Sequence, residues 1–206
     1  MRLDKTFVSR WSDRYVRREL GPLERELLTA THGAITARGY LTADDLRRIG
    51  EWKTQRVRGY LGRNADEAII DVSRLAFAPT TPEWMRHHVL CILDGVRHPM
   101  ASAILTVWKP ETHTVLDYRA VAALQELKKR EALDVEPPEG KRGDLPGYWT
   151  YLQAYASIAK SIGVTFRELD RALWKWHKDG MPEVLPRNER DCAGHVNVAD
   201  DFLAGR

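Results

Sequence analysis

Residues 90–124 read LCILDGVRHPMASAILTVWKPETHTVLDYRAVAAL, and the order of features in this stretch decides the expected fold. The stretch opens with the end of an apolar helix. A tight turn follows around Gly95, and a second helix is expected from Pro99, because proline suits the first turn of a helix. After a short polar loop, Asp117 precedes a third apolar helix. The stretch therefore predicts two helices joined by a tight turn, with a carboxylate downstream.

The turn between these two helices has the features of a phosphate-binding site. Gly95 permits a positive φ and removes a side chain from the outer surface. The backbone amides around Gly95, Arg97 and the helix start are expected to point outward together, and such a nest binds a phosphate oxygen. Small residues at 101–103 would let the two helices approach closely. The residues expected to hold DNA here are Gly95, Val96, Arg97, His98, Ala101 and Ser102.

Asp117 allows two interpretations from the residues alone. A carboxylate before a helix is first of all an N-cap, because it accepts hydrogen bonds from the first amides of that helix. The same carboxylate would also be kept ionised by the helix N-terminus and by Arg119, and an ionised carboxylate can stabilise a cationic transition state.

The run LDGVRHPMASAIL with TVLDYRAVAAL resembles the helix-hairpin-helix DNA glycosylase superfamily, whose hairpin reads Leu-Pro-Gly-Val-Gly-x-x-x-Ala. The matching positions are Leu93, Gly95, Val96 and Ala101. In that superfamily an essential aspartate follows the hairpin at a set distance, and Asp117 stands at that distance. The close match covers about a sixth of the chain.

This resemblance implies a two-lobed, mainly α fold and a monofunctional DNA glycosylase. Such an enzyme flips a modified or damaged base out of double-stranded DNA and hydrolyses its N-glycosidic bond. Asp117 would stabilise the oxocarbenium-like state or activate water. The biological role implied is base excision, either in DNA repair or against modified foreign DNA.

Departures from the family pattern restrict the chemistry. Pro99 stands where bifunctional members carry a Schiff-base lysine, and proline cannot form an imine, so lyase chemistry by that route is excluded. Cys91 and Cys192 are too few for an iron–sulfur cluster. The hairpin's monovalent cation is the one cofactor that the resemblance implies, and Arg97, in place of the second glycine, would alter the hairpin or displace that cation.

A second resemblance is to a little-characterised group of bacterial proteins. These share a Gly-Val-x-x-Pro-x-Ala-Ser-Ala-Ile-Leu run, an Asp-x-Arg-Ala after it, and a late Arg-Glu-Leu-Asp-Arg-Ala-Leu-Trp helix. The last motif is Arg167 to Trp174 in this chain. This resemblance implies no particular activity.

Other basic and aromatic residues are candidates for DNA contact. Lys53, Arg56 and Arg119 could meet the backbone, and a flipped base needs aromatic faces. Each aromatic residue taken singly is at least as often a core residue. Trp108 carries extra weight, because it is expected on the loop between the hairpin and Asp117. The base-pocket candidates are Trp52, Tyr60, Trp108, Tyr118, Trp149 and Tyr151.

Local signals elsewhere predict further helices. No stretch keeps the alternation of apolar and polar residues that is typical of a strand. Thr42 with Asp45, and Thr165 with Glu168, have the spacing of capping boxes. Asn64 or Asp66 is expected to cap the next helix, and Thr81 the one that leads into the turn. The fold is therefore expected to be mainly α.

Length and composition place the chain among ordinary globular proteins. Its 206 residues make one domain, expected over 1–182 with lobes divided near the Pro- and Gly-rich residues 132–147, and a tail over 183–206. The net charge of +3 and the pI near 8.9 are compatible with nucleic-acid binding. Without a signal sequence or an apolar run of membrane length, a cytoplasmic monomer is expected.

Two other functions remain open from the sequence. The chain could be a non-catalytic helix-hairpin-helix DNA-binding protein, in which Asp117 is only a helix cap. It could also be a small helical interaction protein whose Trp-rich C-terminal helices form a docking face. No metal site is expected, since His195 and Cys192 in the tail lack further ligands beside them.

Overall fold

The structure, a computed structural model, describes residues 2–133, 135–141 and 144–182. The described residues are mainly helical, as predicted, and their only β pairing is an isolated bridge between Lys141 and Asp144. The expected tail, with Cys192 and His195, lies outside the described residues. In chain order the elements are α1 (Lys5–Arg18), α2 (Pro22–Glu26), the π-helical turn η1 (Leu27–Thr31), α3 (His32–Arg38), α4 (Ala43–Lys53), the 3-10 turn η2 (Gln55–Val57), α5 (Arg58–Leu61), α6 (Asp66–Phe77), α7 (Glu83–Leu90), α8 (His98–Trp108), α9 (Tyr118–Lys129), α10 (Tyr148–Ile162) and α11 (Phe166–Lys178).

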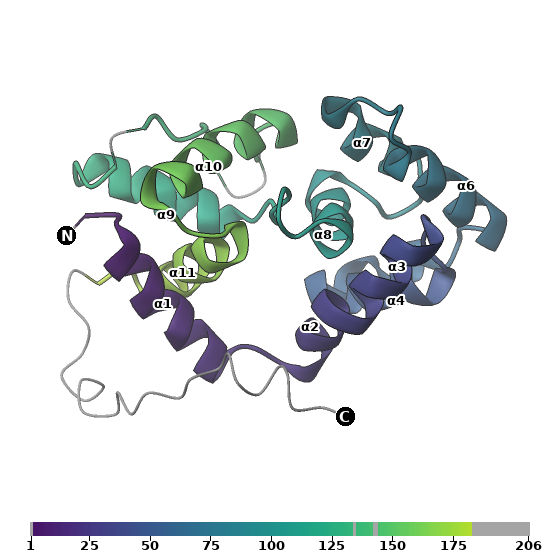
Figure 1. Ribbon diagram of the computed structural model, residues 1–206, viewed down its shortest axis with the longest axis horizontal. Coiled ribbons are helices and arrows are strands. Elements are labelled where there is room, and N and C mark those ends of the chain that lie inside the picture. Colours follow the sequence, from purple (N-terminus) through teal and green to yellow (C-terminus); the bar gives the residue numbers. More distant parts are fainter. Residues whose placement is uncertain (1, 134, 142–143, 183–206) are drawn as a thin grey trace.

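The helices form two neighbouring groups (Figure 1). One group contains α1, α9, α10 and α11, in which α11 packs against each of the other three. Phe7 of α1 meets Trp176 of α11 edge to face, with ring centroids 5.5 Å apart. The other group contains α2 to α8 and is arranged around α8, which packs against α3, α4, α7 and η1.

The expected division of the lobes near residues 132–147 is wrong. That segment joins α9 to α10 within one group, and α9 and α11 on either side of it pack together. The chain instead passes between the groups twice, between α1 and α2 and between α8 and α9. Proline and glycine marked a real loop, but only the packing of the helices around it decides whether a loop separates lobes.

Helix α8 is the buried centre of its group. All of its residues from Met100 to Trp108 are buried, which is typical of a helix that is apolar on every side. Its first helical residue is His98, so Pro99 lies at the second position of the first turn. Trp108 is the last residue of α8 rather than a loop residue, which corrects the expected placement.

Several helix starts follow the expected local chemistry. Thr42 with Asp45, and Thr165 with Glu168, form reciprocal capping boxes. Two other starts differ from expectation. Ala65 rather than a polar side chain precedes α6, and the Thr81 hydroxyl donates to the carbonyl of Leu75, so Thr81 closes the turn before α7 and does not cap that helix.

Candidate functional site

The turn between α7 and α8 is held from behind by α5 and the residues after it. Gly95 has a φ of +78°, and a Cβ added there would lie 2.8 Å from Cβ of Tyr60. Asn64 clamps the same turn, because its Nδ2 donates to the Asp94 carbonyl at 3.0 Å and its Oδ1 accepts from the Asp94 amide at 2.8 Å. Glycine is therefore required at residue 95 by both backbone angle and space.

The residues expected to contact phosphate divide into an outer and an inner set. Arg97 and His98 are exposed. Within the described residues, the amides of Gly95 and Arg97 donate no backbone hydrogen bond, whereas the Val96 amide already donates to Leu93. The inner set is buried and supports the turn from inside: the side chains of Val96, Ala101 and Ser102.

Ser102 connects the turn to the approach to Asp117. Its Oγ accepts a hydrogen bond from the Leu116 amide at 2.8 Å and donates one to the Pro99 carbonyl at 2.8 Å. Ser102 is fully buried and does not face solvent, and its hydrogen bond to Leu116 holds the segment before Asp117 against α8. The hairpin and the carboxylate are thus parts of one packed unit.

Asp117 is the N-cap of α9 and is also half of an ion pair. One carboxylate oxygen accepts from the Arg119 amide at 2.9 Å, and the other accepts from Lys53 Nζ at 3.0 Å. Lys53 also donates to the Leu116 carbonyl at 3.3 Å. Burial opposes ionisation, but Lys53 and the Arg119 amide outweigh it and hold the pKa of Asp117 below its ordinary value. Asp117 is therefore a carboxylate at neutral pH.

Arg119 and His177 flank this carboxylate. The Arg119 guanidinium lies 3.2 Å from Nδ1 of His177 and stacks over the rings of Tyr118 and Trp174. Burial and the neighbouring Arg119 lower the pKa of His177. His177, on the last turn of α11, was not expected from the sequence, because 58 residues separate it from Arg119.

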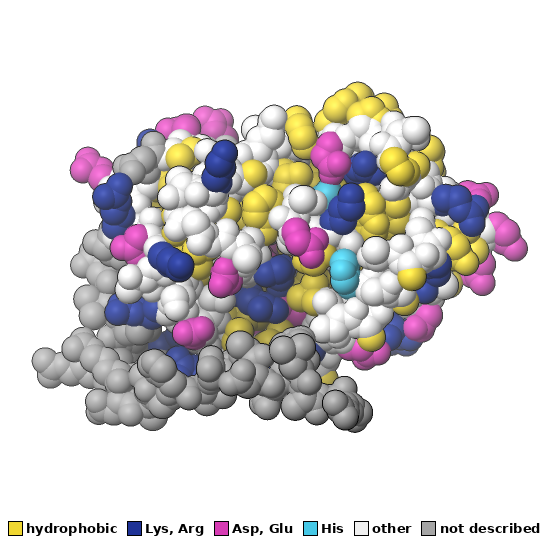
Figure 2. Space-filling view, in the orientation of Figure 1, with side chains coloured by type: hydrophobic (Ala, Val, Ile, Leu, Met, Phe, Trp, Pro, Cys, Tyr) yellow, Lys and Arg dark blue, Asp and Glu magenta, His cyan; other side chains and the backbone are white. Residues whose placement is uncertain are grey.

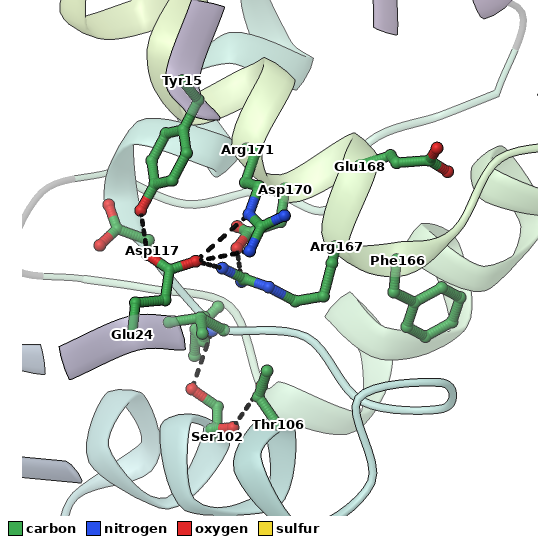
Figure 3. A network of polar contacts seen from close by, with 12 residues as sticks. Tyr15, Glu24, Ser102, Thr106, Asp117, Phe166, Arg167, Glu168, Asp170 and Arg171 are labelled. Carbon is green, nitrogen blue, oxygen red and sulfur yellow. Dashed lines mark hydrogen bonds and ion pairs between the residues drawn. The ribbon is translucent and has the colours of Figure 1, made fainter. Parts of the chain in front are cut away.

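A buried polar network lies beside Asp117 (Figure 3). Oε1 of Glu24 accepts from Arg167 at 2.6 Å and from Arg171 at 3.0 Å, and its Oε2 accepts from the Tyr15 hydroxyl at 2.6 Å. Arg167 also pairs with Asp170 on the next turn of α11. The network ties α1 and α2 to α11, and so joins the two groups of helices.

Asp170 carries a second perturbed carboxyl group. Its burial, together with the charge of Asp117, raises its pKa to about 6 despite the opposing charge of Arg167. The pKa of Asp117 is thus lowered, whereas the pKa of Asp170 is raised. The Arg-x-x-Asp-Arg spacing within the late helix motif is the sequence signal for Asp170, because it places Arg167 and Asp170 one turn apart on α11.

Two of the expected base-pocket residues are core residues. Trp108 stacks on Phe77 with ring centroids 4.5 Å apart, and it packs beneath the Arg86 guanidinium. Tyr151 is fully buried, and its hydroxyl donates to the Val115 carbonyl at 3.4 Å. Neither ring offers a face to a base.

The remaining aromatic candidates lie on four different helices. Tyr118 adjoins Asp117 in the chain, and Trp52, on α4 with Lys53, lies under the Arg167 guanidinium. Trp149 is half-buried at the start of α10, and Tyr60 is exposed beside the hairpin turn. Arg56, an expected DNA contact, is exposed on η2. An open hollow lies elsewhere, lined by Pro110, Glu111, Ala156, Ala159, Lys160, Val164, Thr165, Phe166 and Arg167.

Charge is mixed on the face shown in Figure 2. Lysine and arginine side chains alternate there with aspartate and glutamate, and apolar side chains gather over α6 and α7. The exposed apolar residues include Leu75 of α6, Trp84 of α7 and Ile92 just after α7. On the face shown in Figure 2, the positive charge is therefore not gathered into one broad basic surface.

Comparison with known proteins adds no family to these observations. No family model, no curated protein and no solved structure matches the chain. Among the described residues, no helix is both long and apolar enough to cross a membrane.

Proposed function

We propose that this protein is a monofunctional DNA glycosylase that hydrolyses the N-glycosidic bond of a flipped, modified or damaged base. The observation that carries the proposal is the state of Asp117. It is an ionised carboxylate, 20% exposed, at a helix N-terminus, and it is tied through Leu116 and Ser102 to a glycine turn. Substrate loses its base through an oxocarbenium-like state, and a fixed negative charge stabilises that cation.

The turn supplies the grip on DNA. The amides of Gly95 and Arg97, which donate no backbone hydrogen bond among the described residues, can hold a backbone phosphate together with the exposed Arg97 side chain. Such a contact does not read sequence. Because Ser102 bonds both the first turn of α8 and the residue before Asp117, a phosphate held at the turn has a defined position relative to the carboxylate.

The amines near Asp117 favour hydrolysis over a mechanism that passes through an imine. Pro99 occupies the position where the family's Schiff-base lysine stands. Lys53 is near the carboxylate, but its ammonium donates to Asp117 and to the Leu116 carbonyl, which favours an electrostatic role. As the sugar becomes cationic, it would compete with Lys53 for Asp117, and the carboxylate would then stabilise the sugar or orient the attacking water.

A second candidate function is a non-catalytic helix-hairpin-helix DNA-binding protein. The observation in its favour is that Asp117 already has the partners of a structural cap, one backbone amide and one lysine. In that case the turn would bind phosphate, and Asp117 would only begin α9.

One experiment separates these functions. Duplexes carrying uracil, oxidised, alkylated or hypermodified bases are incubated with the protein, and abasic sites are then cleaved with alkali. We expect Asp117→Asn to reduce single-turnover base release at least about 100-fold, the lower end for a lost acid–base or charge-stabilising group. Asp71→Asn, at an exposed position of α6, is the matched control and should retain wild-type activity.

Two results would contradict the glycosylase proposal. The first is tight, salt-dependent DNA binding without release of any base, which would favour the non-catalytic function. The second is full activity in Asp117→Asn, which would remove Asp117 from the chemistry. Trapping of a covalent protein–DNA adduct by borohydride would overturn the monofunctional assignment alone.

A further inference from the structure

Three histidines meet at the hairpin, on the side of α7 that faces the start of α8. His87 and His88 stand in the last turn of α7, and His98 is the first residue of α8. The ring centroids are 3.9 Å apart for His87 and His88, 5.2 Å for His87 and His98, and 5.5 Å for His88 and His98. One nitrogen from each ring lies within 4.8 Å of those of the other two.

The turn itself brings these rings together. Nine residues lie between His88 and His98 in the chain, and the clamp by Asn64 and the positive φ of Gly95 fold this segment tightly. The cluster therefore depends on the same turn geometry as the phosphate nest, although its ligand atoms are side-chain nitrogens and not backbone amides.

His87 provides an independent indication of a ligand. Its side chain is only 2% exposed, and its Nδ1 is buried with no hydrogen bond of good geometry among the described residues, although a weak contact with the Trp84 backbone acts to raise the pKa of His87. A buried polar atom without a partner destabilises a protein, so such an atom is normally satisfied by something the chain alone does not supply. A metal ion bound by the three imidazoles would give the buried His87 ring a partner.

The side-chain chemistry suits a metal ion, because imidazole nitrogens are ligands that Zn²⁺ prefers. Neutral imidazole is the form that donates its lone pair to a metal. The nearby charge of Arg97 weakens binding of any cation, so the affinity should be below that of a site without it.

We propose that His87, His88 and His98 bind a divalent transition-metal ion, with Zn²⁺ the best match, and that the ion joins the end of α7 to the start of α8. Three imidazoles and a water form a common four-coordinate zinc site. At a Zn–N bond length of about 2.0–2.1 Å, tetrahedral ligand nitrogens lie about 3.4 Å apart. The present atoms are within 4.8 Å, and the exposed His88 and His98 can close the difference by rotation.

Cys91 borders the cluster without completing it. Its Sγ lies 3.9 Å from Nδ1 of His98, but it does not join the group of ring nitrogens that all lie within 4.8 Å of one another. Water is therefore assigned to the fourth position. A dication here would also add positive charge beside the amides of Gly95 and Arg97, which are the groups offered to phosphate.

The test measures metal binding by the full chain without DNA, so its outcome is independent of any glycosylase activity. Chelator-treated protein is titrated with Zn²⁺ by calorimetry, and with Co²⁺ by visible absorption, since strong d–d bands report four-coordinate Co²⁺. We expect one ion per chain and intense bands. His88→Ala and His98→Ala, both at exposed positions, should each weaken binding at least about 100-fold, because loss even of groups that merely support a ligand costs 10–100-fold.

His32→Ala is the matched control. His32 lies at the other end of α8, where its Nδ1 is 3.0 Å from the Val107 carbonyl, so this variant should bind Zn²⁺ like wild type. The proposal is overturned if no stoichiometric binding occurs, if the Co²⁺ complex has only the weak bands of an octahedral aquo ion, or if His88→Ala and His98→Ala bind as tightly as His32→Ala.

Discussion

The ion pair between Lys53 and Asp117 offers a quantitative test of how the candidate site is held. Replacing Lys53 with methionine keeps most of the side-chain volume and removes the ammonium. The carboxylate of Asp117 then keeps only its hydrogen bond from the Arg119 amide, and the Leu116 carbonyl loses a donor. An ionised, mostly buried group would be left without its cation.

The expected loss follows from the geometry. At 3.0 Å and an effective dielectric constant of about 20, the attraction is about 5–6 kcal/mol, most of which desolvation of the two ions offsets. Breaking a fully buried pair costs about 3–5 kcal/mol, and an exposed pair contributes about 0–1 kcal/mol. Because the side chains of Lys53 and Asp117 are 13% and 20% exposed, we expect Lys53→Met to lower the free energy of unfolding by about 2 kcal/mol.

The loss should depend on pH in a defined direction. The folded state lowers the pKa of Asp117, so its ionisation stabilises the fold above the unfolded pKa of about 3.9, and this contribution disappears as the pH falls through the folded pKa. In Lys53→Met the pKa of Asp117 should be higher than in wild type, because burial still opposes ionisation and the lysine no longer offsets it. The difference between wild type and Lys53→Met should therefore be largest near neutral pH and shrink below about pH 4.

Urea unfolding of a double-mutant cycle measures the pair directly. Asp117→Asn combined with Lys53→Met leaves no unpaired charge, so the double variant should be more stable than the sum of the single losses predicts, with a coupling of at least about 1 kcal/mol. Lys129→Met, at an exposed position of α9, should stay within about 0.5 kcal/mol of wild type. Additive losses, or a Lys53→Met penalty no larger than that of this control, would refute the reasoning.

Two further substitutions test the turn and the network beneath it. Gly95→Ala should lower the free energy of unfolding by about 2–3 kcal/mol and weaken DNA binding, because the backbone has positive φ and the new Cβ would lie 2.8 Å from a side-chain carbon of α5. Gly33→Ala is the control, since its Cβ meets open space, and it should be neutral or slightly stabilising in urea unfolding. Glu24→Ala should lower the free energy of unfolding by about 3–5 kcal/mol, because two mostly buried arginines of α11 lose their carboxylate. Glu67→Ala, at an exposed position, should change the stability little. Equal losses in the two glutamate variants would contradict the role given to the network.

Features governed by neighbours in the chain could be predicted from the sequence. The capping boxes at Thr42 and Thr165 form because each hydroxyl and the acidic side chain three residues later reach each other's amides within one turn. The positive φ of Gly95 and the capping role of Asp117 are likewise local. The caps expected at Asn64 and Thr81 failed because both side chains bond to other parts of the chain.

Burial was predicted less well, because residue type does not say which side of a helix is covered. Ala101 and Ser102 were expected at a DNA-facing turn, but α8 lies inside its group of helices and buries both. Trp108 was expected on a loop and instead stacks on Phe77 from another helix. A helix that is apolar on all sides is expected to be buried over its whole length. This pattern predicts the burial of Ala101 and Ser102 better than their place after a turn does.

The sequence by itself determined the mainly helical class, the turn at Gly95 and the aspartate that begins the next helix, since each depends on backbone preferences and on contacts within a few residues. Only the tertiary structure decided which charges and rings face that turn and that aspartate. Lys53 meets Asp117 across 64 residues. Glu24 meets Arg167 across 143 residues, and the three histidines converge only because the hairpin closes. Such encounters follow from the packing of whole helices, which no local pattern specifies.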